Sequence, residues 1–161
     1  MEHQQRFPTN IFIGDDFINS LEGPEYTDSL IQGMKKHIEK LWAKRDKNKP
    51  NFQTHPFLYN EKEFQPLADL ILKKNLENMK TLKYNVELEN LFMSGMWANI
   101  IAPGEMHRAH THSNNLWSGV YYLYSDQNAG ITFQDPRPAA DVLVPRKLEH
   151  TTENSNLLLY A

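Results

Sequence analysis

The chain has 161 residues, of which 40% are hydrophobic and 23% charged, a composition typical of one globular domain. Its net charge of −3 argues against a general nucleic-acid binder, because such proteins normally have a basic excess. The absence of cysteine excludes disulfides, iron–sulfur clusters and thiol nucleophiles, so any metal must be held by His, Asp, Glu and water. No apolar run approaches the ~18 residues of a membrane span and no signal sequence is recognisable, so we expect a cytosolic protein.

The first half of the chain predicts two amphipathic helices. One begins near Gly23-Pro24-Glu25, where proline and an acid suit a first turn, and its apolar residues recur at helical spacing to about residue 45. The second covers residues 61–82, with an apolar face on one side and charged residues on the other. We interpret His37 as a partly exposed helix residue, because it lies beside the apolar stripe, and His55 as a loop residue, because no second ligand type lies near it in the sequence.

The second half changes to short β-type segments separated by turn residues. Alternation and aromatic or β-branched content predict one or two strands within residues 86–101 and four more after it. Helices followed by strands favour an α+β domain with helices that flank a β-sandwich or barrel. We therefore predict a single domain, 1–161, with a helical flank at 1–85 and a β core at 86–161. The strand candidates are residues 11–13, 86–101, 118–125, 130–133, 142–144 and 157–160.

Three of the seven histidines fall within six positions, between two of the predicted strands. If His110 and His112 lie on a strand, both point to one face, about 6–7 Å apart at the backbone, and can converge on one metal ion. His107 is three residues from His110 and on a strand would face the other way, so we predict a pocket wall or outer residue there. The alternative is that all three are surface histidines on a polar loop.

The neighbourhood of this segment carries a family resemblance. A fixed order of motifs over about residues 88–161 resembles the Fe(II)- and 2-oxoglutarate-dependent oxygenases of the phage and marine-bacterial type, which are similar to prolyl hydroxylases. The helical half matches this family only loosely. The motifs are Trp97-Ala98-Asn99-Ile100, Pro103-Gly104, His110-Thr111-His112, Leu116 to Leu123, and Gly130 to Arg137.

The resemblance implies a double-stranded β-helix, or jelly roll, with Fe(II) and 2-oxoglutarate in its mouth. It makes His110 and His112 the metal ligands, with His112 where most relatives have a carboxylate. Tyr122 matches a tyrosine that contacts 2-oxoglutarate, although a core aromatic is the alternative, and Asn99 is assigned to the same cosubstrate. Possible pocket residues are His107, Trp97 and Arg137, the last in a turn.

The resemblance also implies parts that come after the strand at 157–160. In the family a distal histidine ligand and a cosubstrate-binding arginine follow that strand, whereas this sequence ends at Ala161. We therefore expect either a fragment or a short form that binds iron and cosubstrate poorly, with exposed sheet edges and low stability or self-association. His150 precedes the strand, and we expect it to be a loop residue rather than the third ligand.

Three functions compete at this point. The first is an oxygenase that decarboxylates 2-oxoglutarate and uses O₂ to hydroxylate a peptidyl residue or small metabolite, with no nucleic-acid or membrane partner. The second is a cupin-like, non-oxidising metal protein, since Gly104 is followed by five residues and then His110-x-His112. The lack of a Glu between His112 and Glu149 weakens it, because cupins use a further Glu ligand. The third is a structural protein or inactive truncated oxygenase with a decayed site.

Overall fold

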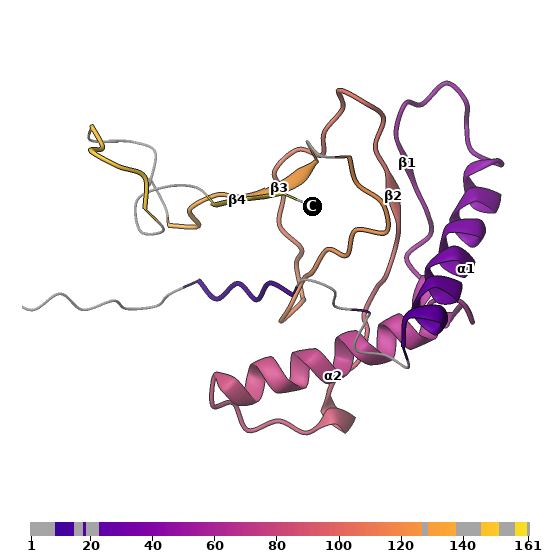
Figure 1. Ribbon diagram of the computed structural model, residues 1–161. Helices are drawn as coiled ribbons and strands as arrows, with labels where there is room; N and C mark the ends of the chain where they lie inside the picture. Colours follow the sequence, from indigo (N-terminus) through magenta and orange to yellow (C-terminus); the bar gives the residue numbers. More distant parts are fainter. Residues whose placement is uncertain are drawn as a thin grey trace, which may run out of the picture. The chain divides into compact units, whose positions relative to one another are not determined.

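The computed structural model describes residues 9–14, 18, 23–126, 129–137, 146–151 and 157–160. The chain divides into two compact units, residues 12–119 and residues 1–11 with 120–161, which are treated separately below. Figure 1 shows the two long helices of the first unit and the β3–β4 pair of the second. The single-domain organisation and the jelly roll stay predictions. Among the described helices, none combines the length and the hydrophobicity that crossing a bilayer requires.

Helix α1, Pro24–Trp42, confirms the first predicted helix. Gly23 precedes it with φ of 112°, a backbone conformation that favours glycine, and Pro24 occupies the first turn, where its missing N–H costs nothing. The helix buries Met34 and Ile38, one helical turn apart, and these two side chains form its contribution to the core.

Helix α2, Gln65–Thr81, confirms the second predicted helix but begins four residues later than residue 61. Residues 61–64 form a turn in which the carbonyl of Glu61 accepts the backbone N–H groups of Phe64 and Gln65 at 2.9 and 3.1 Å. The short 3₁₀ helix η2, Leu58–Asn60, precedes that turn, and a second one, η3, Leu88–Asn90, follows α2. The buried apolar residues of this region are Leu58, Phe64, Leu67, Ala68, Leu70 and Met79.

A short antiparallel sheet in the same unit fixes the chain that leads to the histidines. Strand β1, Phe52–Gln53, pairs with β2, Asn99–Ile100, so that Phe52 faces Ile100 and Gln53 faces Asn99. The pairing continues as the N–H of Thr54 donates to the carbonyl of Ala98 at 3.0 Å. Of the predicted strand region 86–101, the structure makes only Asn99–Ile100 a strand, whereas β1 was not predicted.

In the second unit, β3, Gly130–Phe133, pairs antiparallel with β4, Leu157–Tyr160, and this confirms both predicted strands. The structure draws no strand over residues 11–13 or 118–125, where the sequence predicted one. Ile13 and Val120 are 63% and 62% exposed, so neither segment has the buried face that fixes a strand pairing. The candidate strand 142–144 lies outside the described residues.

Candidate metal centre

The histidine segment follows a tight turn after β2. The backbone N–H of Glu105 donates to the carbonyl of Ala102 at 3.0 Å, and Gly104 has φ of 82°, as the third position of a type II turn requires. Residues 112–115, which follow this turn, contact residues 94–97, which precede it, at two places within the first unit. The turn therefore brings the histidines back beside residues 94–97.

Two side-chain contacts fix the position of residues 112–115 relative to residues 94–97. The hydroxyl of Ser94 donates to Asn115 Oδ1 at 2.8 Å, and the indole of Trp97 stacks on His112 with ring centroids 5.2 Å apart and planes at 21°. From the first contact to the second, the position advances three residues on one segment and goes back three on the other. The two segments therefore run antiparallel. Asn114 has φ of 62° between these contacts, a conformation that asparagine tolerates well.

The side chains of His110 and His112 lie close together, although the strand on which that expectation was based is not formed. Their Nε2 atoms lie 3.0 Å apart, and the rings stack with centroids 5.0 Å apart and planes at 24°. Histidine nitrogens bind metals at ~2.0–2.1 Å, so two ligands at right angles around one ion lie ~3.0 Å apart. The residues present therefore fit a pair of neighbouring ligands on one metal ion.

The second nitrogen of His110 fixes its tautomer. Its Nδ1 lies 2.8 Å from the backbone carbonyl of Arg108. Because a carbonyl oxygen only accepts, Nδ1 must carry the proton, and in the neutral ring Nε2 then presents its lone pair toward His112. Metal-binding histidines generally donate their other ring N–H to a carbonyl or carboxylate in this way.

Trp97 supports His112 from the other side. Its own position follows from the β1–β2 pairing and from a hydrogen bond that the backbone N–H of Leu58 donates to the carbonyl of Met96 at 3.0 Å. A Cβ atom added to Gly95 would lie 3.3 Å from the Trp97 ring, so only glycine leaves the indole its present place without adjustment. Contacts within the first unit thus fix the Trp97 indole, on which the His112 ring stacks.

His107 does not follow the strand-parity argument. The structure assigns no strand to residues 106–112, and the His107 ring lies 6.0 Å from that of His110, with the planes at 51°. The parity argument assumed a regular strand and does not apply to this exposed loop, in which the two rings are neighbours, so the role of His107 as a pocket or outer residue stays a prediction.

The remaining predicted residues lie apart from this pair in sequence and element. Asn99 is an exposed residue of β2. Tyr122 belongs to the second unit, is 38% exposed, and its pKa is raised because part of its ring is withdrawn from water. His150 lies in that unit as well, outside any strand, as expected for a loop residue.

Arg137, also in the second unit, is paired with Asp135. Its Nε donates to both carboxylate oxygens at 2.9 and 3.1 Å, its Nη2 donates to Oδ2, and its backbone N–H donates to Oδ1 at 3.0 Å. These bonds to Arg137 lower the pKa of the Asp135 carboxyl to about 2. The Asp135 carboxylate thus closes the turn predicted at this position and accepts hydrogen bonds from the Arg137 guanidinium.

A second group of potential ligands was missed in the sequence. His37, Glu61 and Glu63 lie together in the first unit, where α1 meets the turn before α2. Neither the periodicity of α1 nor the Glu-x-Glu spacing links residues this far apart. Only the packing of the two helices could have revealed the group.

Residues 95–161 match the family model described as "Putative 2OG-Fe(II) oxygenase". The matched segment contains the His110–His112 pair, Trp97 and Asn99, and also Tyr122 and Arg137. This match supports the resemblance that the order of motifs predicted. No curated protein and no solved structure matches the chain.

Proposed function

We propose that the chain acts as a 2-oxoglutarate- and Fe(II)-dependent oxygenase that hydroxylates a peptidyl residue or a small metabolite. The observation that carries this proposal is the 3.0 Å approach of the His110 and His112 Nε2 atoms, within the segment that resembles such oxygenases. The proposal includes the jelly-roll fold, in which β3 and β4 would be two of the strands.

His110 and His112 would hold Fe(II), which when bound supplies the activation of O₂ at the expense of 2-oxoglutarate. The Arg108 carbonyl keeps the His110 ring in the orientation and tautomer that binding needs. The indole of Trp97 covers one face of the His112 ring, so water is kept from that side.

The ligand charge has a consequence for the cosubstrate. Two neutral imidazoles leave both positive charges of a divalent ion uncompensated, whereas a His-carboxylate pair would cancel one of them. We expect weaker metal binding without cosubstrate and a strong mutual dependence between the metal and dianionic 2-oxoglutarate. Tyr122 and Asn99 are the proposed contacts of that cosubstrate, and His107 and Arg137 are proposed pocket residues.

An anaerobic titration with Fe(II) and 2-oxoglutarate tests the proposal. The unmodified chain should develop a weak visible charge-transfer band only when both are present, and His110→Ala or His112→Ala should abolish it. The matched control is His55→Ala, which removes an exposed loop histidine. A band that persists in both variants, or no band in the unmodified chain, would contradict the assignment. Tight Zn²⁺ or Mn²⁺ binding without such a band would favour the cupin-like alternative instead.

A further inference from the structure

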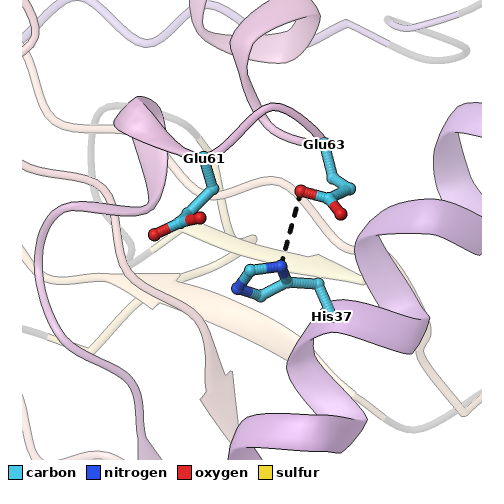
Figure 2. A group of neighbouring side chains, drawn as sticks. All are labelled: His37, Glu61 and Glu63. Carbon is cyan, nitrogen blue, oxygen red and sulfur yellow. Dashed lines mark ion pairs between the residues drawn. The ribbon is translucent and has the colours of Figure 1, made fainter.

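His37, Glu61 and Glu63 form a second group of potential metal ligands. One nitrogen or carboxylate oxygen from each residue lies within 4.8 Å of those of the other two, and all three residues are half-buried. Figure 2 shows the His37 ring extending from α1 toward the turn that carries both glutamates. None of these residues belongs to the segment that resembles the oxygenases, so this group is independent of the proposed function.

The fold places His37 firmly. In the sequence it lies between Met34 and Ile38, the buried apolar residues of α1, and its ring meets the buried ring of Phe64 edge to face, with centroids 5.6 Å apart. Only 18% of the His37 side chain is exposed, so the imidazole is held by packing and is not a freely rotating surface group. Its position is set by the α1 core contacts before any ligand binds.

The glutamates are placed by the turn at residues 61–64. The bond from the Phe64 N–H to the Glu61 carbonyl closes this turn at 2.9 Å, so that Lys62 is exposed while Glu61 and Glu63 are half-buried. Gly33 of α1 lies beside Glu63, and a Cβ atom there would be in ordinary contact with the Glu63 Cγ at 3.8 Å.

Among the described residues, the group has one ion-pair contact, between His37 and Glu63. His37 Nδ1 lies 3.5 Å from Glu63 Oε2, beyond the 2.7–3.2 Å of a good N–H···O hydrogen bond. No residue that the structure describes forms an ion pair with Glu61. A single histidine can pair with at most one carboxylate at a time, so the second carboxylate has no cationic partner within the group.

We propose that His37, Glu61 and Glu63 bind a divalent transition-metal ion of the zinc type, which ties α1 to the turn before α2. One imidazole and two carboxylates suit such an ion and leave at least one position for water. Ligand atoms at ~2.1 Å from one ion lie about 3.0–4.2 Å apart, so a small rotation of the glutamate side chains closes the group. The ion balances both carboxylates at once.

Titration with Co²⁺, followed through its visible ligand-field bands, tests this site when the other histidine pair is removed. In the full chain carrying His110→Ala and His112→Ala, one Co²⁺ should still bind and Zn²⁺ should displace it. Adding Glu61→Gln or Glu63→Gln should weaken that binding by at least ~10-fold, since even groups outside the coordination sphere contribute this much. Glu77→Gln is the matched control, because Glu77 is an exposed residue of α2 that pairs with Lys74. Unchanged Co²⁺ affinity in the glutamine variants would overturn the proposal.

A measurement on the unmodified chain guards against variants that fail to fold. Paramagnetic Mn²⁺ should broaden the amide NMR signals of Gly33, His37 and Phe64 at substoichiometric concentration. Signals of residues 108–112 should respond separately if the histidine pair also binds. Broadening confined to residues 108–112, with the three former signals unaffected, would overturn the proposal and leave the proposed oxygenase site intact.

Discussion

The Nε2 atoms of His110 and His112 lie 3.0 Å apart while the Nδ1 atom of His110 contacts the Arg108 carbonyl at 2.8 Å. The two contacts together orient one lone pair and set the spacing of two ligands in advance. The protein therefore has little ring rotation left to restrict when a metal binds, and this lowers the entropic cost of binding. Residues that position Trp97 and His112 should therefore affect metal binding without being ligands.

Replacement of Trp97 by leucine should weaken metal binding without removing a ligand. The indole stacks on His112 at 5.2 Å, and a contact of this kind contributes ~0.5–1.5 kcal/mol, which corresponds to about 2- to 12-fold in affinity. Co²⁺ titration of Trp97→Leu measures the change. The control is Trp42→Leu, since Trp42 is an exposed residue of α1 whose ring contacts the Arg45 guanidinium and no histidine of the pair. Equal losses in the two variants would show that the stack on His112 does not support the site.

Gly95→Ala should displace the Trp97 indole that stacks on His112. The new methyl group would lie 3.3 Å from the Trp97 ring and 3.7 Å from the Pro56 carbonyl, so the indole must shift away. We expect a destabilisation of about 1 kcal/mol, the low end of overpacking costs, and a change in Trp fluorescence. Urea denaturation measures the first effect. Gly119→Ala, where nothing lies within 4 Å, should leave both unchanged, and an equal effect there would argue against a steric cause.

Thr54→Val should loosen the segment that carries Trp97. The Thr54 hydroxyl, on a residue only 6% exposed, accepts the N–H of Ala98 at 3.0 Å and donates to the His55 carbonyl at 3.1 Å. Valine has the same shape but leaves that N–H unpaired, which costs about 1–3 kcal/mol in the free energy of unfolding. Urea denaturation gives the loss, and hydrogen exchange at Ala98 should accelerate. Thr54→Ser keeps the hydroxyl and should recover most of the stability; a serine variant as weak as the valine variant would contradict this explanation.

The carboxyl of Asp135 should titrate near pH 2. Its pKa is lowered from 3.8 to about 2 by the Arg137 hydrogen bonds, so the interaction is present above pH 3.8 and is lost as the pH falls through 2. An NMR titration of the carboxyl carbon measures this midpoint. Arg137→Gln should return it toward 3.8, whereas Arg146→Gln should not. Because the Arg137 side chain is exposed, 1 M salt should also raise the midpoint, and a midpoint insensitive to both changes would refute the pairing.

Local patterns were sufficient for some elements. The helix-start residues and apolar spacing predicted α1 and α2 within a few residues, because these features act over one or two turns of the same helix. The strands β3 and β4 were predicted at the positions they occupy, since each has a compact apolar run between turn residues. The segments 11–13 and 118–125 have similar composition but pair with no strand among the residues that the structure describes, and composition alone does not supply a partner.

The sequence by itself determined that His110 and His112 are near neighbours, because only Thr111 separates them, although they lie in an exposed loop and not on a strand. It did not determine the stack of His112 on Trp97, which depends on a turn and on contacts between β1 and β2. Only the tertiary structure brought His37 to Glu61 and Glu63, because helix packing joins residues that no local periodicity relates. Chemistry that rests on neighbours in the sequence could thus be predicted, whereas chemistry that rests on packed neighbours was decided by the fold.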